Sequence, residues 1–352
     1  MTQSDDSLRI GIIGAGQNTI KQHIPRLQAI DGVTIHSVCN RSVESGQAVA
    51  DQFSIPHVRD SWGQVIDDDE VDAVLIGTWP NMHSTLSIEA LQVAKHVLCE
   101  ARMAMDSREA HTMWDYARGN PETIAMVVPS PFTLHVDDRI RELLAGGAIG
   151  DLINLDISAV SGEFCDPETE ITWRQQRKYS GNNTLTLGIW YEAVSRWVGH
   201  AKSVQALAST QVRLRPDGQK GKAVADVPDH LDVLAELYCG ASARFRCSTV
   251  LGLPPGMRNA AVLYGTEGTL MYSADTNRLY LGKPGQDEIV PMDTPGTAED
   301  AWRVEEEWIS AIAGIEPVRH TTFEEGVRYM EFTDAVMKSS RNGNRIQLPF
   351  EL

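Results

Sequence analysis

The first third of the chain alternates short apolar runs with amphipathic stretches of helical period. The runs are rich in β-branched residues and have no polar face, as in strands of a sheet covered on both sides. The expected strands are 8–14, 33–39, 71–77, 96–100 and 123–128. The expected helices between them are 22–30, 43–53, 85–95 and 107–118. This order predicts an α/β domain with a doubly wound parallel sheet.

The pattern changes after Pro129. One amphipathic helix is expected at 137–145, followed by long segments in which apolar and polar residues alternate between tight turns. These alternating segments are 231–250, 260–272 and 278–281. Such alternation predicts an antiparallel sheet with one face covered. Two later amphipathic stretches, 298–315 and 323–338, predict helices, and 345–348 predicts a last strand.

We therefore expect two domains, as the length of 352 residues also favours. The first, 1–128, is expected to bind a dinucleotide. The second, 129–352, is expected to be an α+β domain with a large, mostly antiparallel open sheet that binds substrate and joins subunits. Its last segment is expected to pack back on the first domain.

The charge balance excludes several partners. The chain has 31 Lys and Arg against 48 Asp and Glu, a net charge of −17, which disfavours nucleic acid and anionic membranes. The start lacks a basic and then apolar leader, and no apolar run reaches the ~20 residues of a membrane span. We expect a cytoplasmic protein. The 5 cysteines have no metal-ligand spacing, so neither a metal nor a disulfide framework is expected.

A glycine turn follows the first expected strand and leads into a helix. Gly14 would permit a tight turn, and Gly16 would let a pyrophosphate approach the free amides at the helix start. The residues expected on the phosphates are Gly14, Gly16, Gln17, Asn18 and Thr19. Thr19 replaces the third glycine of the usual motif, and its larger side chain is expected to loosen helix packing. The alternative is a glycine turn that binds nothing.

The end of the second expected strand bears on cofactor choice. NAD sites usually have a carboxylate there, whereas this chain has Asn40, Arg41 and Ser42. Without the carboxylate nothing repels a 2′-phosphate, which Arg41 and Ser42 would bind. The sequence favours NADP(H). NAD(H) stays open, because Arg41 would also stack on an adenine.

Three segments, 77–83, 95–100 and 188–190, together with this turn resemble the glucose-fructose oxidoreductase, inositol dehydrogenase and MocA family (Gfo/Idh/MocA). The likeness continues through 146–150 and 173–174. It implies a Rossmann domain followed by a mostly antiparallel α/β domain, with the nicotinamide between them. It also implies homodimers or homotetramers joined through the second-domain sheet.

The resemblance also implies roles for single residues. Thr78, Trp79, Pro80 and Asn81 match a loop beside the nicotinamide ribose, and His83 matches the histidine of that motif. Glu100 matches a glutamate near the nicotinamide, and Trp173 and Arg174 match a pair that approaches the cofactor. For His83, a structural role at a helix N-terminus is the alternative.

The chain departs from the family at its proton-transfer residues. The family's Glu-Lys-Pro is Glu100-Ala101-Arg102 here, so the lysine that contacts the reacting hydroxyl is absent. The family's Asp and His, one helical turn apart, are replaced by Thr186 and Trp190. Oxidation of an alcohol needs a proton acceptor, which commonly contributes about 10²- to 10⁴-fold. We therefore expect a non-standard proton-transfer group.

Several residues are candidates for the missing roles. Arg102 would polarise a substrate oxygen but keeps its own proton. The candidates for proton transfer are His83, Tyr191, Glu192 and His135. The candidates for substrate contact are Arg102, Asn182, Asn183, Thr186 and Trp190, with a core role open for Trp190 and a plain turn open for the two asparagines.

The leading hypothesis is an NAD(P)-dependent oxidoreductase that acts on a carbohydrate-like small molecule, a sugar, polyol or related hydroxy or carbonyl compound. A second hypothesis is a cofactor-binding protein without redox turnover, with a sensor or interaction role. A third is a hydrolase or lyase that uses the nicotinamide transiently or not at all. The second and third are motivated by the missing Lys, Asp and His.

Overall fold

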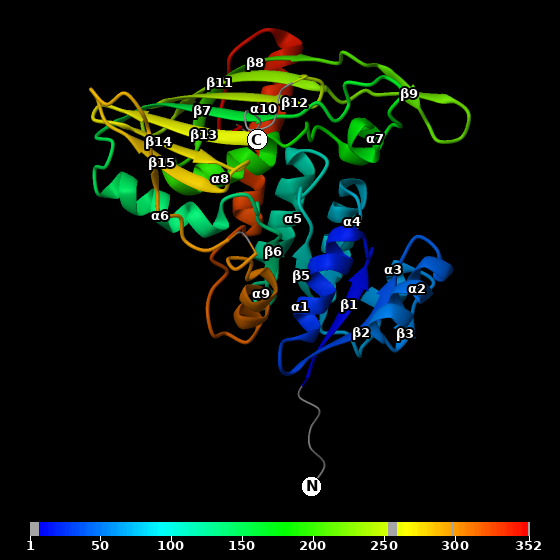
Figure 1. Cartoon of the computed structure of the whole chain (residues 1–352). Helices are drawn as coiled ribbons and strands as arrows, with labels where there is room; N and C mark the ends of the chain where they lie inside the picture. The colour runs from blue at the N-terminus through cyan, green and yellow to red at the C-terminus, as the bar shows by residue number, and fades with distance from the viewer. Residues whose placement is uncertain (1–6, 253–258, 298, 351–352) are drawn as a thin grey trace. The chain divides into compact units, whose positions relative to one another are not determined.

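The computed structural model describes residues 7–252, 259–297 and 299–350, and the chain forms two compact units (Figure 1). Unit 1 comprises Met1–Pro129 and Arg303–Val327, and unit 2 comprises Ser130–Trp302 and Arg328–Leu352. The acidic N-terminal segment 1–6 and position 298, where a late helix is expected to start, lie outside the described residues. The chain passes between the units three times, whereas the sequence predicts a boundary at 128/129 and a return of the last segment.

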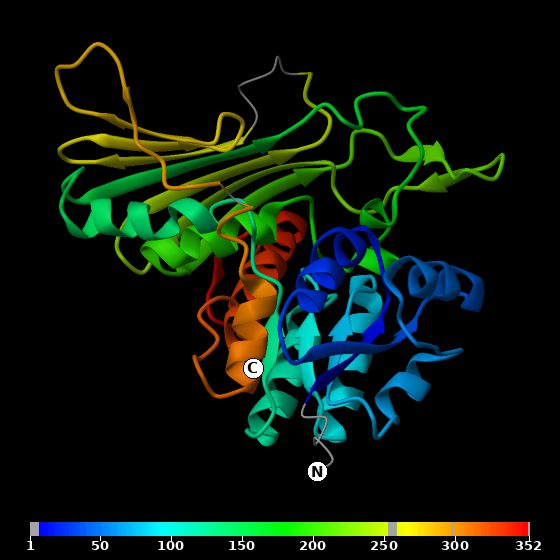
Figure 2. The same ribbon diagram turned by 60° about the horizontal axis from the view of Figure 1, so that its bottom comes forward.

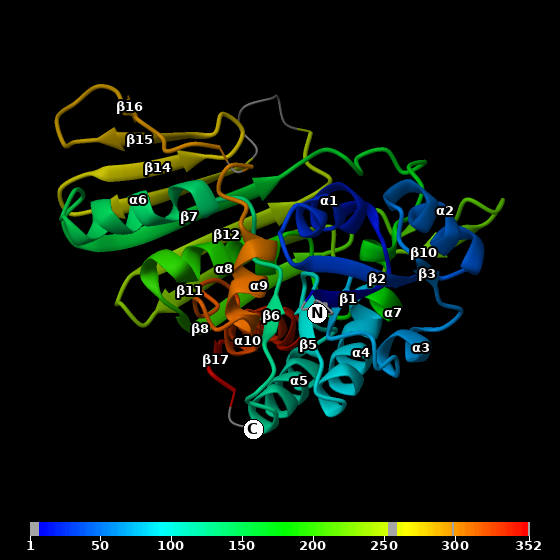
Figure 3. The same cartoon turned by 90° about the horizontal axis from the view of Figure 1, so that it is seen from below.

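Unit 1 is built on a six-stranded parallel sheet with the order β3-β2-β1-β4-β5-β6 (Figure 3). Its strands are β1 (Leu8–Ile13), β2 (Val33–Cys39), β3 (His57–Val58), β4 (Ala73–Ile76), β5 (His96–Cys99) and β6 (Ala125–Val127). Its helices before residue 130 are the π-helix η1 (Thr19–His23), α1 (Ile24–Gln28), α2 (Val43–Phe53), α3 (Trp62–Ile66), α4 (Pro80–Gln92) and α5 (Ser107–Gly119). The predicted doubly wound sheet is confirmed, because in this order two βαβαβ halves meet between β1 and β4.

The carboxyl ends of four strands in unit 1 are aligned. The last residues of β1, β2, β4 and β5 lie opposite one another: Ile13, Cys39, Ile76 and Cys99. Backbone bonds carry the alignment one residue further, since Gly77 N donates to Ile13 O at 2.8 Å and Glu100 N donates to Ile76 O at 2.9 Å. The four loops that follow therefore begin at one edge of the sheet, where doubly wound folds bind their ligands.

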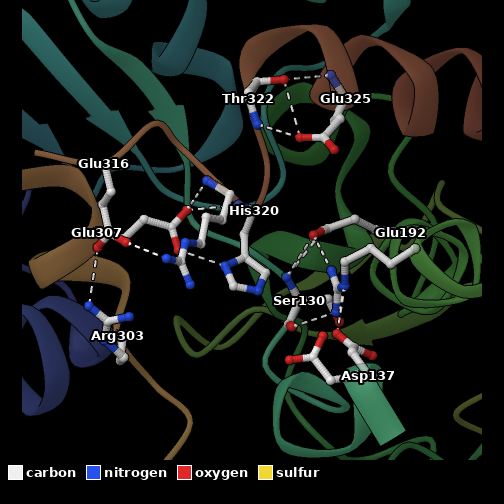
Figure 4. A network of polar contacts seen from close by, with 12 residues as sticks. Ser130, Asp137, Glu192, Arg303, Glu307, Glu316, His320, Thr322 and Glu325 are labelled. Atoms are coloured by element: carbon white, nitrogen blue, oxygen red, sulfur yellow. Dashed lines mark hydrogen bonds and ion pairs between the residues drawn. The ribbon is translucent and has the colours of Figure 1, made fainter. Parts of the chain in front are cut away.

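The segment 303–327 returns to unit 1. It contains α9 (Val304–Ile312) and the first residues of α10 (Phe323–Asn342). Val127 N donates to Thr321 O at 2.9 Å, so this segment covers the outer edge of β6. Glu307 on α9 accepts from His320 N at 2.7 Å and contacts the His320 ring, which fixes the approach to α10 (Figure 4).

Unit 2 contains a nine-stranded sheet with the order β16-β15-β14-β13-β7-β12-β11-β8-β17. Its strands are β7 (Leu152–Val160), β8 (Ala201–Ser209), β11 (His230–Leu237), β12 (Ser242–Ser248), β13 (Asn259–Gly265), β14 (Thr269–Ser273), β15 (Arg278–Gly282), β16 (Val290–Met292) and β17 (Ile346–Gln347). The pair β7–β12 is parallel, and the other seven pairs are antiparallel. A separate two-stranded sheet joins β9 (Leu214–Pro216) to β10 (Lys222–Val224).

One face of the large sheet is covered. The helices of unit 2 are α6 (Leu134–Ala145), the 3₁₀-helix η2 (Trp173–Gln175), α7 (Arg177–Ser180), α8 (Leu187–Val198) and the remainder of α10. α6 and α8 run along the same side of the sheet (Figure 2). A row across four strands faces the core and is buried: Val233, Phe245, Ile157 and Ala261. On the opposite face Leu234 is 61% exposed and Leu207 is 77% exposed, as expected for an open sheet.

Some elements differ from the predictions for local reasons. Helix α4 begins at Pro80 rather than near residue 85, because proline suits the first helical position, where no amide bond is needed. The sequence does not single out β7, because its Asn154 and Asp156 are poor strand formers. Packing between β12 and β13 overrides that weak propensity. No helix among the described residues is long and apolar enough to cross a membrane.

Candidate dinucleotide site and the residues of unit 2

The glycine turn after β1 has the geometry that a pyrophosphate requires. Gly14 has φ +86°, a conformation that side chains disfavour, and a Cβ there would lie 2.7 Å from the Thr78 side chain. A Cβ at Gly16 would meet only Gly77 O, at 3.4 Å, so the other side of Gly16 is open to a ligand. Helical conformation begins at Gln17, which puts the first free helix amides beside the turn. These features fit a dinucleotide.

Thr19 is accommodated where the usual motif has a third glycine. Its side chain is buried, and its hydroxyl donates to Gly14 O at 3.4 Å. A Cβ on Gly77 would lie within 3.0 Å of both Gly14 O and Thr19 Oγ1, so the absence of a side chain at Gly77 provides the space. The expected loosening at Thr19 is thus avoided by the glycine that directly follows the neighbouring strand β4.

The helix after the turn is widened into a π-turn. Ile24 N donates to Thr19 O, five residues earlier, and the next residue, Pro25, has no amide hydrogen to donate. Through this turn His23 points into the interior and is 0% exposed. π-turns inside helices are frequent at functional sites.

The loop after β2 is tied to the glycine turn. Asn40 Oδ1 accepts from Ala15 N at 2.7 Å, and Asn40 Nδ2 donates to Ser45 O at 3.2 Å. Ser42 caps α2 by accepting from Ser45 N at 3.2 Å. Arg41 is exposed and makes no side-chain hydrogen bond or ion pair within the described part of the chain. Its guanidinium is therefore available to a ligand beside the capped helix.

The loop after β4 joins the same edge. Trp79 is the N-cap of α4, Pro80 is its first residue and Asn81 is exposed. His83 is 0% exposed, and its two ring nitrogens lie 3.0 Å from the backbone oxygens of Thr78 and Arg102. Burial lowers the pKa of His83. These contacts tie the loop after β4 to the loop after β5 and favour the structural role for the ring.

The loop after β5 contains a buried charge cluster. His23 Nδ1 lies 2.5 Å from Glu305 Oε1 on α9, and His23 Nε2 lies 3.1 Å from Glu100 Oε1. Asn18 Nδ2 donates to the same Glu100 oxygen at 2.5 Å, and Ala101 N donates to Glu100 Oε2 at 3.0 Å. The side chains of His23 and Glu305 are 0% exposed and that of Glu100 is 14% exposed. We call these three residues the acid–histidine cluster.

The pKa shifts in the acid–histidine cluster have a common cause. Burial alone would lower the pKa of His23, but its bonds to Glu100 and Glu305 outweigh burial and raise the pKa to about 9. Burial would likewise raise the pKa of Glu100, but the bonds from His23, Asn18 and Ala101 N outweigh it and hold that pKa below its ordinary value. At neutral pH, His23 is therefore a cation and Glu100 an anion.

Arg102 belongs to the same loop after β5. It is 6% exposed, and its carbonyl oxygen faces His83. The peptide bond between Ala101 and Arg102 is cis. Unit 1 thus brings together the predicted residues of the glycine turn and of the loops after β2, β4 and β5.

In unit 2, Trp173 and Arg174 form most of the short helix η2. A capping box between Thr172 and Gln175 starts it, and the Arg174 guanidinium carbon lies 4.4 Å above the Trp173 ring centroid. Arg174 is exposed and Trp173 is half-buried. The pair therefore presents a charged, aromatic surface on unit 2.

The predicted substrate asparagines make internal bonds. Asn182 Oδ1 accepts from Arg177 at 2.8 Å and from Arg341 at 3.0 Å, while its amide donates to Asp334 at 2.9 Å. Asn183 is 0% exposed and donates to Ser180 O at 2.8 Å. The Asn183 geometry is that of the plain turn that the sequence leaves open.

The candidate site residues at the start of helix α8 differ in how far they are buried. Thr186 is the half-buried N-cap residue, whereas Trp190, one turn later, is 1% exposed and packs 5.5 Å from the Phe132 ring. Tyr191 is 2% exposed, its hydroxyl accepts from Ala201 N at 2.9 Å, and burial raises its pKa. These positions favour core packing for Trp190 and a structural role for Tyr191.

Glu192 and His135 also lie in the interior of unit 2. The Glu192 carboxylate accepts from Ser130 N at 3.0 Å and from Arg196 at 2.7 Å, and Arg196 in turn donates to Asp137 at 2.7 Å (Figure 4). His135 is 8% exposed, and burial lowers its pKa. The Glu192 contacts bind the start of unit 2 to α8, which favours a structural role.

Two residues of the acid–histidine cluster, His23 and Glu305, escape the sequence analysis. The fold brings them together across 282 positions of the chain. The available signals are a histidine inside the helix after the glycine turn and an acidic run at the start of a late helix, and neither points to the other. Within the described ranges, no three His, Cys, Asp or Glu side chains are grouped to hold a metal ion.

Comparison with known families matches both parts of the chain. The model of an oxidoreductase family with an NAD-binding Rossmann fold, Gfo/Idh/MocA, matches residues 8–128. The model of the Gfo/Idh/MocA C-terminal domain matches residues 138–271. The two matches follow one another in the order that the sequence resemblance implies.

Individual proteins are similar over most of their length. An uncharacterised oxidoreductase of Synechocystis is 24% identical over 332 residues, which cover 89% of this chain and 88% of that protein. D-glucoside 3-dehydrogenase of Escherichia coli is 23% identical over 351 residues, 97% of each chain. A solved structure of levoglucosan dehydrogenase with NADH and L-sorbose has a TM-score of 0.86 at 20% identity and covers 97% of this chain and 99% of that one. At this identity the structural likeness establishes the fold.

Proposed function

Because the chain belongs to the Gfo/Idh/MocA family of oxidoreductases, we propose that it uses a nicotinamide dinucleotide to oxidise or reduce a sugar, a polyol or a related hydroxy or carbonyl compound. The observation that supports this most is the alignment of four loops at the carboxyl edge of unit 1. The names of two relatives, D-glucoside 3-dehydrogenase and levoglucosan dehydrogenase, support the substrate class. We place the enzyme in the cytoplasm.

The cofactor, when bound, supplies or accepts a hydride. The residues of this chain hold it: the open side of Gly16 and the helix amides from Gln17 onward bind the pyrophosphate. The loop after β4, with Thr78, Trp79, Pro80 and Asn81, continues the site toward the nicotinamide half. Trp173 and Arg174, which belong to unit 2, remain further candidates for cofactor contact.

NADP(H) is the favoured form of the cofactor, with NAD(H) as the alternative. The loop after β2 has no carboxylate to repel a 2′-phosphate, and Arg41 has no competing partner in the described chain. Ser42 lies beside it at the start of an 11-residue helix, whose dipole attracts anions. These groups supply the local positive field that a protein of net charge −17 lacks overall.

Arg41→Ala is expected to weaken NADPH binding by about ten- to a hundredfold, because a charged hydrogen bond contributes roughly 1.5–3 kcal/mol. NADH affinity is expected to stay within about twofold, since NADH has no 2′-phosphate. Isothermal titration with both cofactors measures this. Arg108→Ala, which removes an exposed cation from α5, is the matched control. Equal losses for NADPH and NADH would instead indicate stacking of Arg41 on the adenine.

The proton-transfer group is non-standard in this proposal. The positions of the usual lysine, aspartate and histidine hold Ala101, Thr186 and Trp190. Three residues are only secondary candidates for catalysis: His83, Tyr191 and Glu192. Their polar side-chain atoms make hydrogen bonds with backbone atoms of the protein. Arg102 is the best candidate to polarise the substrate oxygen, since its charge lies in the loop after β5.

Arg102→Ala is expected to lower kcat by about ten- to a hundredfold while cofactor affinity stays nearly intact, because a polarising charge acts on the reacting oxygen. Steady-state kinetics and cofactor titration measure the two effects separately. Arg102→Lys should recover part of kcat, since lysine keeps the charge but loses the planar fork. Unchanged turnover in Arg102→Ala would assign Arg102 to structure.

A panel of sugars, polyols and their carbonyl forms tests the proposed function. We expect one class to change the ultraviolet absorbance of the nicotinamide and to yield product by chromatography. Tight cofactor binding without any product would favour a binding protein with a sensor or interaction role, as the missing catalytic residues suggest. Product without a net change in the nicotinamide would favour transient use of the cofactor in a hydrolase or lyase.

The open face of the unit 2 sheet is the proposed surface for a homodimer or homotetramer. Leu207 and Leu234 are exposed there, and register places them on the same face as Asp232. Large apolar side chains on an open sheet favour contact with a second copy. Sedimentation equilibrium measures the mass, and a monomer at micromolar concentration would contradict this part of the proposal.

A further inference from the structure

His83 lies between two acceptors, and the number of protons on its ring decides how many of them it binds. The ring is 0% exposed, with Nε2 3.0 Å from Thr78 O and Nδ1 3.0 Å from Arg102 O. A backbone oxygen only accepts hydrogen bonds, so each contact requires an N–H on the ring. A neutral imidazole has one N–H and an imidazolium has two. The neutral ring therefore bonds one of the two oxygens at a time, whereas the imidazolium bonds both.

The contact that lacks a proton is unfavourable. It places the lone pair of a ring nitrogen 3.0 Å from a carbonyl oxygen. Because the ring of His83 is fully buried, bulk water does not supply the missing donor. A buried polar group without its hydrogen bond costs about as much free energy as the bond itself. We therefore expect the neutral ring to hold one oxygen and the imidazolium to hold both in place.

The two oxygens belong to neighbouring loops of the cofactor edge. Thr78 is in the loop after β4, which continues to Asn81, and Arg102 is in the loop after β5. Strands β4 and β5 pair directly, so the two loops begin side by side. His83 itself belongs to α4, which starts at Pro80. A ring bonded to both oxygens therefore fixes the spacing of the loop beside the nicotinamide and the loop of the polarising residue.

We propose that His83 is a positioning residue that clamps these two loops together when its ring takes up a proton. The His83 ring with Thr78 O and Arg102 O is called the histidine clamp below. The clamp rests on the proposed function, in that it positions the two loops for a nicotinamide cofactor. The closed clamp binds the cofactor more tightly, because loops that are already ordered cost less to fix on binding. By linkage, a bound cofactor then increases the affinity of His83 for its proton by the same factor.

The surroundings of His83 set the pH range of the clamp. Burial has the largest effect and lowers the pKa of His83 below its ordinary 6.5. The backbone oxygens of Thr78, Arg102 and Met103 and the charge of Glu100 act in the other direction and raise the pKa. The clamp is therefore expected to close as pH falls below 6.5.

The other elements packed against α4 add no carboxylate or amine to the buried surroundings of His83 within the described chain. The buried residues of β4 and α3 are apolar, and α5 contributes Ser107, Ala110 and Met113. The Cys99 thiol at the end of β5 keeps its proton, because burial raises its pKa. Besides His83, the charged groups to consider are therefore Glu100 and Arg102 in the loop after β5.

Nitrogen NMR of protein with isotope-labelled histidine tests the clamp without any cofactor. The chain has 10 histidines, and the ring signals that disappear in His83→Gln identify those of His83. At about pH 8 we expect one protonated and one bare ring nitrogen, and toward about pH 5 we expect conversion to two protonated nitrogens. A ring that stays neutral throughout this range, or is an imidazolium throughout, would overturn the proposal.

Titration calorimetry with NADPH and with NADH, in buffers of different ionisation enthalpy, measures the coupling to the cofactor. We expect wild type to take up part of a proton per cofactor at about pH 6. Its affinity should be about three- to tenfold higher at about pH 5.5 than at about pH 8, as one added hydrogen bond provides. His83→Gln should show neither effect of the ring, because glutamine does not titrate. The titration of a 2′-phosphate is common to both proteins and cancels in the difference.

Two control variants separate the clamp from other titrating groups. Arg102→Ala removes the guanidinium but keeps the backbone oxygen that faces His83, so the pH dependence of its cofactor affinity should match that of wild type. His57→Gln removes an exposed histidine of β3 and should also leave the pH dependence unchanged. Loss of the pH dependence in either control would assign the proton to a group other than the clamp and contradict the proposal.

The failure of the clamp and the failure of the proposed function give different results. If wild type binds neither NADPH nor NADH, the proposed function fails, and the NMR titration still decides whether the ring of His83 takes up a proton. If wild type binds a cofactor with the same proton uptake and the same pH dependence as His83→Gln, the clamp alone is refuted. No proton uptake by wild type at about pH 6 refutes it without any variant.

Discussion

Gly77→Ala is expected to abolish cofactor binding in practice and to destabilise unit 1. A Cβ at this position would lie within 3.0 Å of Gly14 O and of Thr19 Oγ1, and the backbone oxygen has no room to move without displacing the phosphate turn. Overpacking of this kind costs roughly 1–3 kcal/mol. Loss of two charged hydrogen bonds to the pyrophosphate would lower cofactor affinity on the order of a hundredfold or more. Cofactor titration and thermal unfolding measure the two effects.

The matched control is Gly63→Ala on α3 of the same unit. A Cβ there would meet its nearest atoms at 3.9 Å, so alanine fits and should stabilise the helix slightly. Cofactor affinity should remain at the wild-type value in this control. Wild-type affinity in Gly77→Ala as well would mean that the turn after β1 does not bind the phosphates.

His23→Gln is expected to remove a pH dependence of stability from unit 1. His23 has a folded pKa of about 9, above its ordinary 6.5, so its contribution is fully present below pH 6.5 and is lost as pH rises through 9. A shift of this size corresponds to roughly 3 kcal/mol. The free energy of unfolding of the variant should therefore lie well below that of wild type at pH 6.5 and approach it above pH 9.

Urea unfolding combined with amide hydrogen exchange measures this difference, because exchange distinguishes amides of unit 1 from those of unit 2. His83 titrates in the opposite direction: burial lowers its pKa, so it destabilises the fold as pH falls below 6.5. Between pH 6.5 and 9 the pH dependence of the free energy of unfolding therefore reports on His23 and not on His83. Parallel pH profiles for wild type and His23→Gln in this window would show that the folded protein does not hold His23 as a cation.

The fold could be predicted where burial is periodic. The strands of unit 1 read as continuous apolar runs because both faces of that sheet are covered, and the hairpins β11–β12 and β13–β14 read as alternating runs. Strand β7 is central to the second sheet, yet Asn154 and Asp156 weaken its signal. Its place depends on strands more than 80 positions later, which no local pattern contains.

The candidate site could be predicted where its residues form a motif of neighbouring positions in the sequence. Gly14 and Gly16 are recognisable because a glycine turn at the first strand–helix junction has few other purposes. The space that Gly77 leaves for Thr19 is visible only in three dimensions. Glu192 is close in sequence to the expected catalytic positions. Its carboxylate, however, accepts a hydrogen bond from Ser130 N inside unit 2. Side-chain direction on a helix depends on what the helix packs against, and a single sequence does not state this.

The return of residues 303–327 to unit 1 has a consequence for synthesis of the chain. Val127 at the edge of β6 and His23 in the interior obtain their partners, Thr321 and Glu305, from this late segment. While the ribosome is still producing the first part of unit 2, the nascent unit 1 has an uncovered strand edge, and His23 does not yet have its contact with Glu305. Such edges are prone to wrong pairing. The N-terminal unit is thus among the first to emerge and yet is completed only when nearly the whole chain has been translated.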